Sequence, residues 1–124
     1  MSKKEDAVQL KMSRHNCAQA VLCAYENETG LHAATLKKIG AGLGLGMGNM
    51  ECTCGALSGA EIVLGLLKHH GKSVYPEASV LNERFRELCG STVCKEIKGR
   101  DTGKILCSCE DCVKNAVGIL EELL

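Results

Sequence analysis

The sequence predicts an all-α fold, a compact bundle of about five helices with a glycine-rich loop before the third. Apolar residues recur at steps of three and four along most of the chain, and no stretch shows the alternation of a half-buried strand. The only aromatic residues are Tyr25, Tyr75 and Phe85, so aliphatic and small side chains must build the core, which favours closely packed helices. The length of 124 residues is enough for one buried core and predicts a single domain over residues 1–124.

The first predicted helix is long because residues 2–28 contain no glycine or proline. One of its faces follows helical spacing and consists of Leu10, Ser13, Cys17, Ala20 and Ala24. We therefore expect Cys17 to face the interior. The thiol of Cys23, about 240° further round the helix, should point away from that of Cys17. A second, short helix is expected over residues 31–39, with Gly40 ending it in a left-handed conformation.

Five glycines alternate with other residues from Gly40 to Gly48, shortly before the thiols of Cys52 and Cys54. Each glycine inside a helix costs about 0.8–1 kcal/mol relative to alanine, so together they disfavour a helix by about 4–5 kcal/mol. Residues 40–50 are therefore predicted to be an extended or irregular loop. Our interpretation is that this backbone lets a second sulfur, a metal ion or a substrate approach the helix that starts at Cys54.

The third predicted helix spans residues 54–70, where Gly55 and Gly59 would let another backbone pack closely. A fourth helix is expected from Pro76, a residue favoured in the first turn, and should end at Gly90. The inner face of this fourth helix is predicted to consist of Ala78, Leu81, Phe85 and Leu88.

The remainder of the chain is predicted to be a mixed segment followed by one helix. Residues 91–106 lack helical periodicity, and Gly99 and Gly103 mark turns within them. The last helix should start at Ser108, because Ser108 and Asp111 have the spacing of a capping box. Its apolar stripe consists of Cys109, Cys112, Val113, Ala116, Val117, Leu120, Leu123 and Leu124.

Charge and hydropathy exclude two classes of partner. Fifteen basic and fifteen acidic residues give a net charge of zero, which argues against nucleic-acid binding. The least charged segment, residues 39–67, contains Glu51, Glu61 and many glycines, so it is not expected to be membrane-embedded.

The start of the sequence has no apolar secretory segment, which predicts a cytoplasmic protein. The pair Gly55 and Gly59 and the final leucine-rich stripe are compatible with a homodimer.

Nine cysteines are far above ordinary usage and indicate thiol redox chemistry or metal ligation, since an odd number cannot pair completely within one chain. The thiolate is the reactive form, and a helix N-terminus lowers the pKa of a thiol placed there. Cys54 and Cys109 are both predicted at such positions. Cys23 and Cys89 lie within helical patterns and are interpreted as small buried apolar side chains.

Metal ligation is the alternative function. Five candidate ligands lie in two short stretches and could hold zinc or an iron–sulfur cluster: Cys52, Cys54, Cys107, Cys109 and Cys112. Only the step from Cys109 to Cys112 has the common CxxC spacing, so the match to a standard zinc site is poor. His15 and the pair His69 and His70 could add ligands or a base, although histidines near helix ends are usually solvated.

Four stretches together resemble one known family. They are NCAQAVL around Cys17, the GLGMG run that leads to CGALSGA with Cys54, GSTVCKEI around Cys94, and CVKNAVGILEELL from Cys112. The chain is similar, from about residue 13 to its end, to the C-GCAxxG-C-C family of redox-active proteins. The resemblance implies that these four cysteines are the functional set. This chain departs from the family label because its cysteine opens the motif, as CGAxxG, and because it carries five further cysteines.

We therefore expect a redox protein that uses dithiol/disulfide exchange, with Cys54 as the attacking thiol. One of Cys17, Cys94 and Cys112 would resolve the mixed disulfide, and the sequence leaves the pairing open. The expected partner is a redox protein or a small-molecule thiol or disulfide. A zinc or iron–sulfur module remains the alternative.

Overall fold

The computed structural model describes residues 2–124, and within them it is all-α, as predicted. Nine helices lie in this part of the chain, six of them with seven or more residues, so the expected number of about five is too low. Their bounds are α1 Lys3–Met12, α2 Cys17–Ala24, α3 Glu26–Thr29, α4 Ala33–Gly40, α5 Gly44–Met47, α6 Gly55–Lys68, α7 Tyr75–Cys89, α8 Cys94–Lys98 and α9 Cys109–Leu123. Among these residues the one β-type contact is an isolated bridge between Thr53 and Val93.

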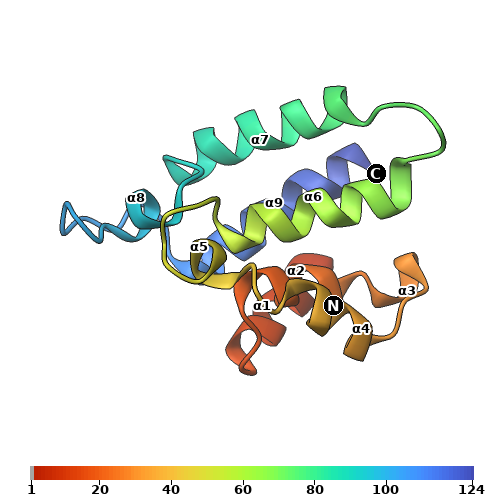
Figure 1. The fold of residues 1–124 in the computed structure, drawn as a ribbon, viewed down its shortest axis with the longest axis horizontal. Helices are drawn as coiled ribbons and strands as arrows, with labels where there is room; N and C mark the ends of the chain where they lie inside the picture. Colours follow the sequence, from red (N-terminus) through yellow and green to blue (C-terminus); the bar gives the residue numbers. More distant parts are fainter. Residues whose placement is uncertain (1) are drawn as a thin grey trace.

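The long helices form layers (Figure 1). α6 and α9 lie in the middle, α7 packs on one side of them, and α1 and α2 pack on the other. The core between these layers is aliphatic and includes Leu22, Leu57, Leu64 and Leu120, with Phe85 as its largest buried side chain. α5, α8 and the starts of α6 and α9 lie together at one end of the bundle, the left end of the view in Figure 1.

The predicted helix over residues 2–28 is in fact three helices, α1, α2 and α3. α1 ends at Met12, and Arg14 adopts a left-handed conformation with φ of 72°. Asn16 then caps α2 in a reciprocal capping box with Gln19. The break lets α1 pack against α9 while α2 packs against α6, which a single straight helix could not do.

The glycine run is more compact than the predicted extended loop. The predicted left-handed conformation of Gly40 is wrong, because Gly40 is the last residue of α4. Its role is close packing, since a Cβ there would lie 3.0 Å from the Leu22 side chain. Residues 44–47 form α5, a short irregular turn in which Leu45 and Gly46 have left-handed φ values of 55° and 56°. The irregular course agrees with the prediction, and the close packing explains why glycines are needed.

Gly55 and Gly59 pack within the chain, because a Cβ at Gly59 would lie 2.8 Å from the carbonyl oxygen of Ala18 in α2. The close backbone approach is therefore confirmed, but both glycines are buried. The inner stripe of α9 is buried as well, from Cys112 to Leu120. The stripe ends in Leu123 and Leu124, which are partly exposed, so the predicted homodimer stays a prediction.

α7 and α9 begin and end close to the predicted residues. Pro76 lies in the first turn of α7, and Gly90 ends that helix with φ of 87°. The predicted inner face is wrong at Leu88, whose side chain is 55% exposed, and Cys89 is buried in its place. Ser108 caps α9 and accepts a hydrogen bond from the backbone N–H of Asp111. Along residues 2–124, every helix is too short or too polar to cross a membrane.

Candidate functional site: a cluster of cysteine thiols

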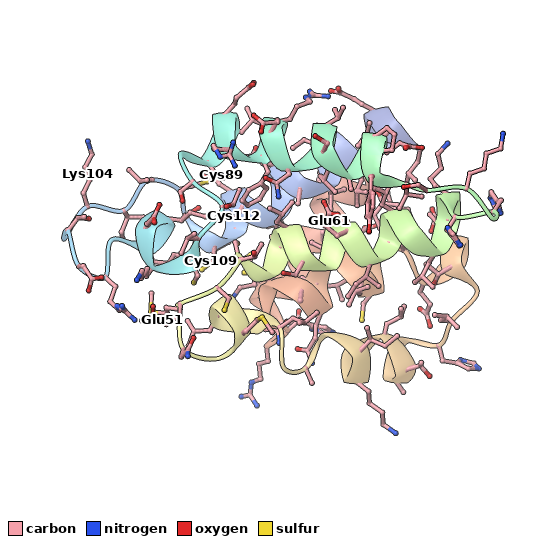
Figure 2. All side chains as sticks on the ribbon, turned by 45° about the horizontal axis from the view of Figure 1, so that its top comes forward. Glu51, Glu61, Cys89, Lys104, Cys109 and Cys112 are labelled. Carbon is pink, nitrogen blue, oxygen red and sulfur yellow. The ribbon has the colours of Figure 1, made fainter. Side chains whose placement is uncertain are left out.

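Seven cysteines converge at the end of the bundle where several helices begin or end. Three of them, Cys89, Cys109 and Cys112, are labelled in Figure 2 and lie at the same end of the molecule. This group, called the thiol cluster below, consists of Cys17, Cys54, Cys89, Cys94, Cys107, Cys109 and Cys112. Four of them stand at the starts of α2, α6, α8 and α9 or cap those starts, and Cys89 is the last residue of α7. Helix termini far apart in the sequence thus bring the sulfur atoms together.

A cavity of about 180 Å³ forms the first half of the cluster. Four thiols line it, those of Cys17, Cys54, Cys94 and Cys109. The remaining lining residues are Lys11, Lys98, Asn16, Leu45 and Gly55. Gly46 supports this arrangement, because a Cβ on it would lie 2.5 Å from the Cβ of Cys94. Gly46 therefore leaves room for the side chain of Cys94. The proposed approach of a ligand to Cys54 over this turn stays a prediction.

Cys54 caps α6 and has the surroundings of a stabilised thiolate. The Cys112 thiol donates to its sulfur, and the backbone N–H groups of Ala56 and Leu57 and the charge of Lys98 add to this effect. These interactions outweigh burial and lower the pKa of Cys54 to about 7. Its side chain is only 1% exposed, so a reagent reaches this sulfur through the cavity.

Cys109 and Cys17 form a second thiol contact. The Cys17 thiol donates to Cys109, and together with Lys98 and Lys11 this lowers the pKa of Cys109 to about 5. The same contact, with burial, raises the pKa of Cys17. Cys109 is partly exposed and Cys17 is buried, so Cys109 is the more accessible thiol of the pair. Cys94 completes the cavity, and burial raises its pKa.

The second half of the cluster is a group of three sulfurs, Cys89, Cys107 and Cys112, all within 4.8 Å of one another. We call it the three-sulfur group. Cys112 also donates to Cys54, so it joins the group to the cavity. Asn115 points its side-chain N–H at two of these sulfurs, 3.5 Å from Cys89 and 3.9 Å from Cys107.

Lys98 is the central cation of the site. Its Nζ donates to the sulfur of Cys112 at 3.6 Å and to the carbonyl oxygen of Cys107 at 3.2 Å. Burial acts to lower the pKa of Lys98, but the neighbouring sulfurs of Cys112 and Cys109 outweigh it and raise the pKa. Lys98 was not predicted as a site residue. It lies in a segment without helical periodicity, where the sequence does not indicate which way a lysine side chain points.

Residues 15–123 match the model of the family described as "Putative redox-active protein (C_GCAxxG_C_C)". The chain belongs to the C_GCAxxG_C_C family. Neither the curated proteins nor the solved structures contain a match. Family membership agrees with the resemblance inferred from the sequence, and it adds no substrate.

The structure brings together the four cysteines that the C_GCAxxG_C_C resemblance marks. Cys17, Cys54 and Cys94 line the cavity, and Cys112 contacts Cys54 from the three-sulfur group. Cys89, interpreted from sequence as a buried apolar side chain, belongs to the cluster as well. Its position eight residues after Leu81, at the end of the buried stripe of α7, is the signal that could have found it.

The two remaining cysteines and the three histidines considered above lie outside the thiol cluster. Cys52 is exposed, and its part in the site is a backbone one, since its carbonyl oxygen accepts from the N–H of Cys94 at 3.0 Å. Cys23 points away from the cluster, as predicted, toward the carbonyl oxygen of Ala33. His69 and His70 follow the far end of α6, about 21 Å from its thiol end at 1.5 Å per residue. His15 is near α2, but it does not line the cavity.

Proposed function

We propose that this protein is a dithiol/disulfide redox protein in which Cys54 is the attacking thiol and Cys112 resolves the intermediate. One observation carries this proposal: Lys98 lines the cavity together with Cys54 and also donates to the sulfur of Cys112 at 3.6 Å, so the two thiols are neighbours at the start of α6. The sequence left three candidates for the resolving thiol. The Cys112 thiol has the largest effect on the pKa of Cys54, whereas Cys17 acts mainly on Cys109, which favours Cys112.

The exchange has two steps. The Cys54 thiolate attacks one sulfur of a disulfide RSSR, an S–S bond forms between Cys54 and that sulfur, and one RS⁻ leaves and takes up a proton. The Cys112 sulfur then loses its proton and attacks the sulfur of Cys54, which forms the Cys54–Cys112 bond and releases the second RSH. The protein loses two electrons, and the disulfide gains them as two thiols.

The burial of Cys54 favours a small substrate. A side chain that is 1% exposed cannot meet a disulfide on the surface of another folded protein without rearrangement. The cavity of about 180 Å³ admits a small disulfide or part of one. Two lysines line it, Lys11 and Lys98, so a negatively charged small disulfide is favoured over a neutral one.

The other cavity thiols have supporting roles in this proposal. Cys17 and Cys109 form a second dithiol that can store two further electrons, and Cys109 is the thiol that a bulkier partner meets first. Cys94, whose raised pKa keeps it protonated at neutral pH, packs between the glycine-rich turn and the cavity.

Mass mapping of the reduced protein after treatment with oxidised glutathione tests the proposal. The expected product contains the Cys54–Cys112 disulfide. Cys112→Ser should instead accumulate glutathione on Cys54, and Cys54→Ser should lose both products. Cys23→Ser is the matched control, because Cys23 is a buried cysteine outside the cluster. The proposal is wrong if Cys112 and Cys54 are never linked, or if Cys54→Ser reacts like the unchanged protein.

Metal binding is a second candidate function, and one observation favours it, the three-sulfur group. Thiolates select soft ions such as zinc and also hold iron–sulfur clusters. The ligand set differs from the one expected from sequence, because Cys89 joins Cys107 and Cys112, and Cys52 lies outside. Metal analysis of anaerobically purified protein, with its visible absorption spectrum, distinguishes zinc from iron–sulfur.

A further inference from the structure

We infer that the three-sulfur group binds a single thiophilic metal ion, and that metal binding and formation of the Cys54–Cys112 disulfide exclude each other. The first half of this inference stands without the proposed function, and the second half rests on it. Both halves follow from the position of one atom, the sulfur of Cys112. It belongs to the three-sulfur group, and it accepts from Lys98, which lines the cavity beside Cys54.

The spacing of the three sulfurs suits one ion. At a Zn–S bond length of about 2.3 Å, two sulfurs on the same ion lie about 3.8 Å apart. The sulfurs of Cys89, Cys107 and Cys112 lie within 4.8 Å of one another before any adjustment to an ion. They come from the end of α7, from the segment before α9 and from α9 itself, so a bound ion would join these elements.

The surroundings of the three sulfurs resemble the outer shell of a metal site. Asn115 directs its side-chain N–H at Cys89 and Cys107, and Lys98 donates to Cys112. Hydrogen bonds of this kind hold ligands in place, and a nearby cation offsets the excess negative charge of three thiolates around one ion. The donors therefore cover all three ligands.

Burial favours an ion that prefers sulfur to water. Cys112 is 0% exposed and Cys89 is 1% exposed, whereas Cys107 is partly exposed and gives the route of entry. Binding releases the protons of the three thiols. A soft closed-shell ion, Zn²⁺ or Cu⁺, fits this donor set, and hard ions that require oxygen ligands do not.

Sharing of Cys112 produces the exclusion. A Cys112 sulfur bound to a metal ion cannot also form a bond with Cys54, so the attack of Cys54 on a small disulfide stops at the mixed disulfide. Conversely, once two electrons have passed from Cys54 and Cys112 to RSSR, only Cys89 and Cys107 remain as ligands, and the ion is released.

The metal site is tested by competition with a chromophoric chelator, using the reduced, metal-free full chain with Zn²⁺ in one series and Cu⁺ in another. We expect one ion per chain in at least one series, and its loss in Cys89→Ser and in Cys107→Ser. Asn115→Ala should weaken binding by about 10–100-fold, because it removes outer hydrogen bonds and leaves the ligands. Cys23→Ser and Cys52→Ser are controls that should bind normally. Circular dichroism checks that each variant is folded.

The exclusion is tested by following the Cys54–Cys112 disulfide with oxidised glutathione, with and without the ion. At a metal concentration 100 times the Kd, its rate of formation should fall by about 100-fold, since only the metal-free fraction reacts. In Cys107→Ser, the ion should have no effect on this rate. The metal site is overturned if no ion binds in either series, or if Cys89→Ser and Cys107→Ser bind the ion as tightly as the unchanged chain. Either result leaves the proposed function intact. Tight binding without slower disulfide formation overturns the exclusion alone. No disulfide in metal-free protein contradicts the proposed function, and the exclusion with it, and leaves the metal site intact.

Discussion

Replacing Gly46 with alanine tests whether the glycine-rich turn is shaped by the thiol cluster. Gly46 has φ of 56°, in the left-handed region, and a Cβ there would lie 2.5 Å from the Cβ of Cys94 and 2.9 Å from the carbonyl oxygen of Cys52. Carbon atoms in contact normally lie about 3.5–4.0 Å apart, so Cys94 or the turn must move by about 1 Å. Gly46→Ala should therefore strain both the backbone and the packing.

The expected magnitude combines these two costs. The left-handed conformation costs a non-glycine residue about 1–2 kcal/mol, and overpacking adds about 1–3 kcal/mol, which gives a total of about 2–5 kcal/mol. Gly48 is the matched control, because its φ is 91° and nothing lies within 4 Å of its Cβ position. Gly48→Ala should incur the backbone cost alone, about 1–2 kcal/mol.

Urea unfolding of the reduced, metal-free variants measures the difference, with equal m-values showing that the folded states are comparably compact. We also expect thiol labelling of Cys94, which is 3% exposed, to become faster in Gly46→Ala and to stay slow in Gly48→Ala. If Gly46→Ala is no less stable than Gly48→Ala and leaves Cys94 protected, the turn does not hold the cysteine in place.

Three further predictions concern charge, capping and packing. Alkylation of Cys54, followed by mass spectrometry in the metal-free protein, should have a midpoint near pH 7 and be lost below it, because the lowered pKa of about 7 keeps the thiolate populated at neutral pH. Lys98→Met should move this midpoint upward, and an unchanged midpoint would show that the lysine does not stabilise the thiolate. Asn16→Ala should cost about 1–2 kcal/mol in urea unfolding, since it removes the capping box of α2 and a hydrogen bond to the end of α4. In α6, Gly59→Ala should destabilise the fold by about 1–3 kcal/mol, because the new methyl group meets α2. Gly65→Ala has open space around it and should stabilise the fold by up to about 1 kcal/mol. Effects of the same sign would contradict the close packing of α2 on α6.

Local signals predicted the helices well where a cap or breaker marks the helix end. Ser108, Pro76 and Gly90 have roles that depend on neighbours in sequence, and all three stand where they were expected. The break between α1 and α2 was missed because it contains no glycine or proline. Its signal is the capping box of Asn16 and Gln19, which a search for breakers overlooks.

Tertiary contacts explain why the conformation of the glycine-rich turn was only partly predicted. Five glycines exclude a regular helix, and that conclusion needs no tertiary contact. The conformation they adopt depends on what they touch, and Gly44 and Gly46 pack against side chains of Asn16 and Cys94, which lie far from them in the sequence. The side chain of a distant cysteine fills the space that a Cβ at Gly46 would occupy.

By itself, the sequence determined the helical class, the caps, the family and the abundance of thiols, because spacing and composition act over a few residues. Only the tertiary structure decided which sulfurs touch. Cys89 joined Cys107 and Cys112, Cys52 stayed outside, and Lys98 came between the two halves of the cluster. The physical reason is that contact between helix ends depends on how whole helices pack, and packing is set by buried faces distributed along the entire chain.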